Sequence, residues 1–340
     1  MFAMIIAVLL AVLALLTIEP SILPFGASLS LQFPWAQMIA LRGVLAVGFL
    51  VLAVLCFALS LVKRRRIAAI CLSIVFAVTA VGHGLTVWNR GIQPADLTTD
   101  PGITVTSTGN GSITAMELNT LGGKATAQDI ANIMVSRGVD VASLPEAPTT
   151  LGEEVVAILK KEGLSFQQFD PGISKWNSDY SSTVLLVSST LGTYQQIDVA
   201  SSDGSSSKRT VGAKPVDGNG PTFIAVHPIS PDKSLMSKWK EQARAAYALC
   251  AAYPDAVVLG DFNSTADHEA AMGVSGCTDA AVQAHVGGIG TWPSNVPALF
   301  SAPIDRIFTA DGYEGTAGEV IAAGESDHRA LVVRLTPKQK

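Results

Sequence analysis

The feature that most constrains this chain is the series of apolar runs within its first 90 residues. Residues 2–18 contain no charge, and Thr17 is their only polar side chain. Residues 37–62 carry one charge, Arg42, and residues 67–88 contain no Lys, Arg, Asp or Glu and one histidine, His83. A spanning helix needs roughly 20 apolar residues. We therefore expect three N-terminal transmembrane helices within residues 1–89, the first of them at the short end of the range.

The first run has a second interpretation as a cleaved signal peptide. A signal peptide needs a basic start and a small-residue cleavage site. No Lys or Arg precedes Phe2, and Ile18-Glu19-Pro20 is a poor cleavage site. We interpret the run as a retained helix, and we expect the three helices to anchor the chain in the bilayer, with Arg42 reaching the interface by snorkelling.

The loop between the second and third runs sets the orientation, because it holds four consecutive cations, Lys63, Arg64, Arg65 and Arg66. Residues 19–35 have no Lys or Arg. The positive-inside rule places the cationic loop and the N-terminus in the cytoplasm. This predicts a multi-pass cell-membrane protein whose remaining residues lie on the extracytoplasmic side.

The exterior part is long enough for one large core. Residues 90–111 are rich in Pro, Thr, Gly and Ser and read as a linker, so the domain is expected over residues 112–336. From residue 90 onward, 18 Lys and Arg face 27 Asp and Glu, a net charge of −9. Such a domain is poorly suited to nonspecific binding of a polyanion, so nucleic acid is a possible but less favoured substrate. No protein partner is indicated.

Cys250 and Cys277 both fall in this exterior domain, whereas Cys56 and Cys71 fall in the apolar runs. An oxidising exterior permits a disulfide between the first two. Two buried free thiols are the alternative, and the sequence leaves both open.

Strand and helix patterns alternate irregularly through the exterior domain. Several apolar strands follow one another without a helix between them, which favours an α/β fold of layered sheets over a simple doubly wound sheet. The expected strands are residues 112–121, 139–144, 183–188, 222–227, 256–259, 304–309 and 330–335, and the expected helices are residues 127–137, 153–162 and 235–252.

Six of these elements share one arrangement, an apolar strand bordered by a residue that can bind a metal or move a proton. A single acid or histidine in such a place is usually a turn or structural residue, so the argument depends on the set. Carboxylates and carboxamides bind Mg²⁺ through oxygen, and carboxylates and imidazoles transfer protons. The set comprises Asn119, Glu146, His227, Asp261 with Asn263, Asp305, and Asp327 with His328.

The motifs around these residues resemble the endonuclease/exonuclease/phosphatase superfamily. They are L-P-E at 144–146, H-P-x-S-P at 227–231, G-D-F-N at 260–263, I-D at 304–305 and S-D-H at 326–328. The stretch G-T-W-P at 290–293 is similar to a branch of this family found on bacterial membranes. The resemblance implies a four-layer α/β sandwich, two packed mixed β-sheets flanked by helices, and Mg²⁺-dependent hydrolysis of a phosphoester.

The resemblance also implies a role for each residue. Glu146 would be the principal Mg²⁺ ligand, with Asn119 and Asp327 helping to hold the metal, and Mn²⁺ could replace Mg²⁺. Asp261 would orient and deprotonate the attacking water, and Asn263 would position Asp261 or a phosphate oxygen. His328 and His227 would donate to the phosphate, with Asp305 fixing the tautomer of His328. Glu117 is a rival of Asn119 for its place.

Three further polar residues receive weaker interpretations. Asp267 and His268 are expected in a loop or helix cap, with a supporting role near the site as the alternative, and His285 is expected at the surface. The function that we expect is a membrane-anchored extracytoplasmic phosphoesterase acting on a lipid or cell-envelope phosphate. A surface nuclease and a non-catalytic binding protein on the same fold remain the alternatives.

Overall fold

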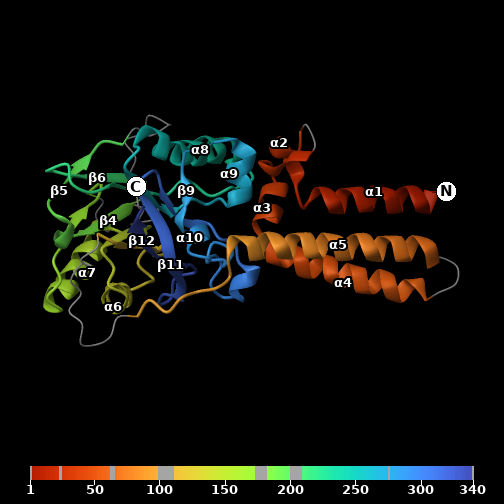
Figure 1. Ribbon diagram of the computed structural model, residues 1–340, viewed down its shortest axis with the longest axis horizontal. Coiled ribbons are helices and arrows are strands. Elements are labelled where there is room, and N and C mark those ends of the chain that lie inside the picture. The colour runs from red at the N-terminus through yellow and green to blue at the C-terminus, as the bar shows by residue number, and fades with distance from the viewer. Residues whose placement is uncertain are drawn as a thin grey trace.

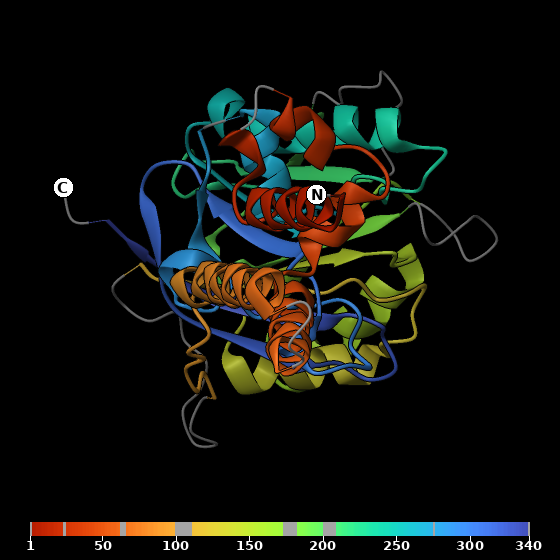
Figure 2. The same ribbon diagram turned by 90° about the vertical axis from the view of Figure 1, so that its right-hand side faces the viewer.

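The computed structural model describes residues 2–22, 25–61, 66–98, 111–172, 182–199, 209–274 and 276–338. Three apolar helices project from one end of an α/β domain (Figure 1), and Figure 2 looks along them. They are α1 (Phe2–Leu16), α4 (Arg42–Ser60) and α5 (Arg66–Arg90). Lys63, Arg64 and Arg65 of the cationic loop lie outside the described residues, as does most of the linker, residues 99–110.

Two of these helices, not clearly three, are long and apolar enough to cross a membrane. They are α4, with 19 residues, and α5, with 25. The 15 residues of α1 rise only about 22 Å at 1.5 Å per residue, which is short of a hydrocarbon core of about 30 Å. The expectation of three spanning helices is therefore supported for the second and third runs, and membrane association rests on these two.

The sequence predicted one helix for the second apolar run, and the structure differs. The run breaks at Leu41 into α3 (Trp35–Ala40) and α4. Together with α2 (Gly26–Ser30), α3 packs against α9 (Ala266–Met272) of the α/β domain. Arg42 was expected to snorkel, but it is only 5% exposed and pairs with Asp267 of α9.

The α/β domain contains two mixed six-stranded sheets. The first has the order β11-β12-β1-β2-β4-β3 and the second β5-β6-β7-β8-β10-β9. The strands of the first are β1 (Ile113–Glu117), β2 (Val141–Pro145), β3 (Phe166–Phe169), β4 (Thr183–Ser188), β11 (Tyr313–Ala322) and β12 (Arg329–Pro337). Those of the second are β5 (Tyr194–Ile197), β6 (Thr210–Pro215), β7 (Thr222–Val226), β8 (Ala256–Asp261), β9 (Thr278–Asp279) and β10 (Asp305–Thr309).

The sheets pack face to face because their strands are apolar on both sides. Alternate residues of each strand point to opposite faces. In β8, Val257 and Leu259 enter the core between the sheets, whereas Val258 enters a core beneath α8 (Met236–Ala252) and α9. In β1, Ala115 faces the other sheet and Met116 faces α6 (Ala127–Arg137) and α7 (Thr149–Lys161). Helices thus cover the outer faces, and the expected sandwich of two packed sheets flanked by helices is confirmed.

Helix termini and the disulfide fix the remaining connections. α6 begins with a capping box between Thr126 and Asp129, a pair that satisfies two otherwise orphaned donors. α7 begins at Thr149, four residues before its expected start, after Pro148 at the N-cap. Cys250 and Cys277, whose pairing the sequence left open, form a disulfide that joins α8 to the segment before β9.

Candidate active site

The polar strand ends meet at one edge of the sandwich because of the strand directions. β1 and β2 run parallel, as do β7 and β8, so their carboxyl ends lie together. β12 is antiparallel to β1 and β10 is antiparallel to β8, which brings their amino ends to the same edge. Asp305 pairs directly with Asp261 in this register. All six strand ends that the sequence singled out therefore converge.

Local backbone geometry turns two of these side chains toward that edge. Glu146 and Asn263 have φ of 57° and 47°, a left-handed conformation that is uncommon for residues other than glycine and clusters at functional sites. By strand alternation alone, Glu146 would follow Ala142 and Leu144 to the helix-covered face. The turn at Glu146 breaks that alternation.

Gly260 permits the close approach of β8 to β7. A Cβ on Gly260 would lie 1.9 Å from the carbonyl oxygen of Val226, and its φ is 156°. No other residue fits there without moving the strands. This glycine therefore sets the position of Asp261, the next residue.

The converging ends border a cavity of about 670 Å³. Seven of the eight predicted site residues line it, and they are Asn119, Glu146, His227, Asp261, Asn263, Asp327 and His328. Asp305 does not line the cavity but lies against His328. Four other lining residues come from the N-terminal segment, and they are Ala36, Gln37, Ala40 and Leu41.

Asn119 connects the two sheets across the floor of the cavity. Its Nδ2 donates to Glu146 Oε1 at 3.1 Å and to Asp261 Oδ2 at 3.0 Å. Asp261 also accepts from the backbone N–H of Asn263 at 2.7 Å and from its Nδ2 at 3.3 Å. The amide of Asn263 in turn donates to the carbonyl of Pro228 at 3.0 Å. These bonds fix both oxygens of Asp261.

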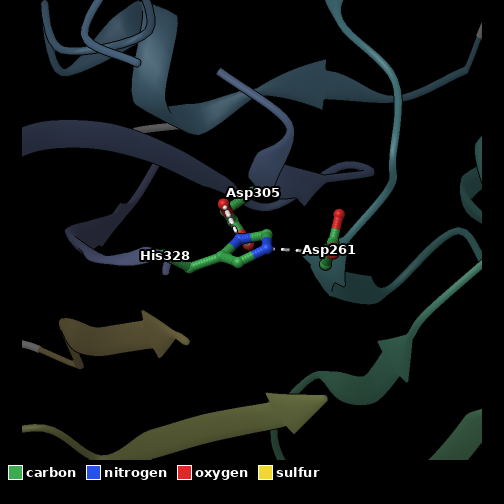
Figure 3. A group of neighbouring side chains, drawn as sticks. All are labelled: Asp261, Asp305 and His328. Atoms are coloured by element: carbon green, nitrogen blue, oxygen red, sulfur yellow. Dashed lines mark hydrogen bonds and ion pairs between the residues drawn. The ribbon is translucent and has the colours of Figure 1, made fainter. Parts of the chain in front are cut away.

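His328 lies between two carboxylates (Figure 3). Its Nδ1 is 2.8 Å from Asp305 Oδ2, and its Nε2 is 3.8 Å from Asp261 Oδ2. Burial alone would lower the pKa of His328, but the charges of Asp305 and Asp261 outweigh burial and raise this pKa to about 9. Burial, and next the charge of Asp305, raise the pKa of Asp261 to about 7. Near neutral pH the histidine is thus a proton donor and Asp261 is poised to accept one.

Glu146 and Asp327 present oxygens that the described protein atoms leave unsatisfied. Glu146 Oε2 and Asp327 Oδ1 are buried and accept no hydrogen bond from the described residues. Such atoms demand a partner, and a divalent cation fits carboxylate oxygens in a cavity. Trp292 Nε1 donates to the other oxygen of Asp327 at 2.9 Å and so orients it.

A second carboxylate group competes as a metal site. Asp261, Asp305 and His328 offer ligand atoms within 4.8 Å of one another. In that group His328 and Asp305 already satisfy each other, and the raised pKa of His328 opposes its use as a neutral ligand. Glu146 and Asp327 therefore fit a divalent cation better.

Arg209, which sequence reasoning missed, also lines the cavity. It lies directly before β6, and its Nη1 is 3.4 Å from Nδ1 of His227. Burial, and next the charge of Arg209, lower the pKa of His227 well below its ordinary value, so His227 is neutral. A single cation at the start of a strand carries no distinctive sequence signal, and only the β6–β7 pairing brings Arg209 to the site.

Glu117, the alternative to Asn119 as a site residue, does not line the cavity. It ends β1 on the face toward the second sheet, fully buried and outside the cavity lining. Burial, followed by the charge of Asp305, raises the pKa of Glu117 well above its ordinary value. It is therefore a protonated carboxyl beneath Asp305, and Asn119 is the residue that reaches the cavity.

Asp267 and His268 lie in the first turn of α9, where a cap was expected, and they also contact the N-terminal segment. His268 Nδ1 accepts from the backbone N–H of Thr265 at 3.0 Å, and its Nε2 lies 2.9 Å from the carbonyl oxygen of Ala36. Asp267 accepts from Arg42 at 2.6 Å and from Arg90 at 2.8 Å. His285 is exposed, as predicted.

A model of the Endonuclease/Exonuclease/phosphatase family matches residues 116–328, which is well over half of the chain. The chain belongs to this family. Its members are metal-dependent phosphoesterases and nucleases, and the chain is an enzyme of that hydrolase class. No curated protein sequence matches it significantly.

The chain is similar to several solved structures. A humanized D. rerio TDP2 with 14 mutations is 17% identical, with a TM-score of 0.50, covering 66% of this chain and 99% of that one. A family protein from Bacteroides thetaiotaomicron is 14% identical, with a TM-score of 0.49, covering 67% and 98%. The human Nocturnin catalytic domain with bound sulfate is 14% identical, with a TM-score of 0.48, covering 67% and 94%. At such identities the likeness of the first structure supports the fold alone.

Proposed function

We propose that this protein is a membrane-anchored, extracytoplasmic phosphoesterase that uses Mg²⁺ or Mn²⁺ to hydrolyse a phosphodiester or phosphomonoester. The observation that carries the proposal is the cavity itself, which brings the unsatisfied oxygens of Glu146 and Asp327 together with Asp261 and the protonated His328. Residues 1–89 form the anchor, residues 90–111 the linker and residues 112–336 the catalytic domain.

Each residue of the cavity has a task in this proposal. Glu146 and Asp327, helped by Asn119, hold the cation, which supplies charge neutralisation at the phosphate when bound. Asp261 accepts the proton of the attacking water, held in place by Asn119 and Asn263. Phosphoryl transfer needs mainly positioning and charge stabilisation, which matches a cavity with one group for each of these demands.

Imidazole and guanidinium groups complete the charge balance. His328 donates from Nε2 to a phosphate oxygen, while Asp305 holds its Nδ1 and keeps it protonated. His227 is neutral and donates from Nε2, which faces Glu146 and Asp261 at 3.7 Å. Arg209 adds a permanent positive charge beside His227. Preorganised donors of this kind stabilise developing negative charge most effectively in a buried site.

The proposed side of the membrane has separate support. The Cys250–Cys277 disulfide suits an oxidising compartment, and this agrees with the orientation given by the cationic loop. In intact cells, protease added from outside should remove the catalytic domain, and a thiol-reactive polyethylene glycol should modify these cysteines only after reduction. A domain protected from the protease would reverse the proposed orientation.

The enzymatic proposal is tested with the full chain in detergent. We expect hydrolysis of 4-nitrophenyl phosphate or bis(4-nitrophenyl) phosphate that is lost with EDTA and restored by Mg²⁺ or Mn²⁺. Glu146→Gln should weaken binding of Mn²⁺, measured by calorimetry, at least 10-fold. Metal-independent turnover, or unchanged Mn²⁺ affinity in this variant, would contradict the assignment.

A further inference from the structure

The cavity has one wall that does not come from the catalytic domain. Ala36, Gln37, Ala40 and Leu41 line the same 670 Å³ space as the catalytic side chains. The first three belong to α3, and Leu41 joins α3 directly to α4, one of the two helices that can cross a membrane. The cavity therefore lies beside α3, which sits where the apolar helices meet the α/β domain (Figure 1).

This wall is bound firmly to the catalytic domain. His268 Nε2 lies 2.9 Å from the carbonyl oxygen of Ala36, and the amide of Gln37 donates to the carbonyl oxygen of Pro231. One residue beyond Leu41, Arg42 forms its buried ion pair with Asp267. Arg90 of α5 binds the same carboxylate, so α4 and α5 are both tied by ion pairs to α9 beside the cavity.

Exposed apolar side chains occur both in the N-terminal segment and in the part of the catalytic domain that packs against α4. Phe25 and Trp35 of the N-terminal segment are 61% and 37% exposed. Leu299 and Phe300, 46% and 38% exposed, lie in the 3₁₀ turn η5 (Ala298–Phe300), which packs against α4. Trp292, 41% exposed, continues this surface into the cavity. Apolar and aromatic residues in such positions are typical of a membrane interface.

We propose that the substrate is a phosphate ester carried by a membrane lipid, whose headgroup enters the cavity along α3 while its acyl chains stay in the bilayer. The inference rests on the proposed function and names its substrate class. Water adds to phosphorus, the P–O bond to the leaving alcohol breaks, and the alcohol leaves with the proton that balances its oxygen. Arg209, His227 and His328 line the cavity and present N–H donors for a single phosphate group.

The same features disfavour nucleic acid. The part of the chain after residue 89 has a net charge of −9, which repels an extended polyanion. α3 also occupies part of the cavity margin, where a polymer longer than one phosphate group would need room. A lipid headgroup needs only the space beside the catalytic side chains.

The substrate class is tested with the full chain and Mg²⁺. Phosphatidylcholine vesicles carrying 10 mol% phosphatidylinositol, phosphatidylglycerol or phosphatidic acid are compared with the deacylated counterpart of each lipid and with plasmid DNA. We expect one lipid to turn over at least 10-fold faster than its deacylated form at equal phosphate concentration. Turnover of plasmid, 4-nitrophenyl esters or deacylated esters without faster lipid turnover would overturn the lipid inference and leave the phosphoesterase proposal standing. No turnover of any ester would refute both.

The role of the α3 wall is tested by two substitutions at one position. Ala40→Trp narrows the cavity and Ala40→Asp adds a charge that repels phosphate, so both should lower lipid turnover at least 5-fold more than turnover of 4-nitrophenyl phosphate. Met38→Trp is the control, because Met38 lies on the other face of α3, against a separate cavity of about 230 Å³. Equal losses on both substrates, or an equal loss in the control, would overturn the inference. The aspartate variant keeps the test valid if the tryptophan variant does not fold.

Discussion

Asp261 and Asp267 are six residues apart in the chain, their side chains are only 1% and 10% exposed, and their surroundings are opposite. Asp267 receives the guanidinium groups of Arg42 and Arg90, which outweigh its burial and lower its pKa well below the ordinary value. Asp261 has no guanidinium partner among the described residues, and burial with the charge of Asp305 raises its pKa to about 7. The first carboxylate is fully satisfied and joins two parts of the molecule, whereas the second is left able to exchange a proton.

The difference shows that burial of an acid does not by itself mark an active site. What separates the two is whether the protein supplies the compensating charge. At the junction, the contact of α4 and α5 with α9, Arg42 and Arg90 supply that charge, and their ion pairs with Asp267 stabilise the contact. In the cavity, the described residues supply Asp261 with less compensating positive charge, which favours the binding of a cation there. The following predictions test this contrast.

Asp261→Asn should have the largest effect, a loss of about 10³-fold in kcat on a soluble phosphoester, because general base catalysis contributes 10²–10⁴-fold. Its thermal stability at pH 8 should stay equal or rise. The folded-state pKa is raised from 3.8 to about 7, so the stability of the fold falls as the pH rises between these values and stays lowered above them. Asparagine removes the charge that causes this loss. A variant with lower Tm and unchanged kcat would reverse the roles that we assign to the two aspartates.

Asp267→Ala should instead lower the stability of the fold and leave kcat nearly unchanged. It removes the carboxylate shared by the buried guanidinium of Arg42 and the half-buried guanidinium of Arg90, and loss of a buried ion-pair partner costs about 3–5 kcal/mol. This loss should appear in urea unfolding of the detergent-solubilised chain. The kcat per folded molecule on 4-nitrophenyl phosphate should change less than about 3-fold. Asp311→Ala, at an exposed turn, is the control and should stay within about 0.5 kcal/mol. Equal stability in both variants would show that the ion pairs do not hold the junction.

The pH dependence should separate the two sites again. Asp261 must be deprotonated and His328 protonated, so kcat/KM should rise about tenfold per pH unit below pH 7 and fall above about pH 9. Asp267, with a lowered pKa, adds stability that is lost only in acid, as the pH falls toward its folded-state pKa. Between pH 6 and 9, kcat/KM should therefore change with pH, whereas the ion pairs of Asp267 with Arg42 and Arg90 should stay intact. The contact can be followed by the extent of maleimide labelling of an Ala36→Cys variant. Labelling that changed between pH 6 and 9, beyond the change in reagent reactivity, would contradict a pH-independent contact.

Glu117→Gln should have the smallest effect. Glu117 is a third buried carboxylate, and its raised pKa leaves it protonated at neutral pH. Because an amide of the same shape replaces a neutral carboxyl group, kcat should change less than about 3-fold and Tm should be unchanged or higher. A loss of 100-fold would instead support Glu117 as a metal ligand in place of Asn119.

Much of the site could be predicted because strand ends and motif order are local properties. The eight residues singled out are all at one edge, seven in the cavity and Asp305 directly behind His328. Arg209 and Trp292 were not given roles, because their importance comes from contacts with His227 and Asp327. β11 was missed as a strand because one side of this edge strand faces solvent and its residues are mostly small or polar.

The sequence alone showed the apolar runs, and the resemblance of its short motifs to a family predicted the sandwich and the candidate site residues. Only the tertiary structure decided that the second apolar run breaks at Leu41, because its residues are equally apolar on both sides of the break. The break lets the carbonyl group of Ala36 in α3 contact His268, and it lets Arg42 pair with Asp267 and not reach the expected membrane interface. Contacts between residues more than 200 positions apart outweigh local helix propensity, and they make part of the second apolar run a wall of the candidate active site.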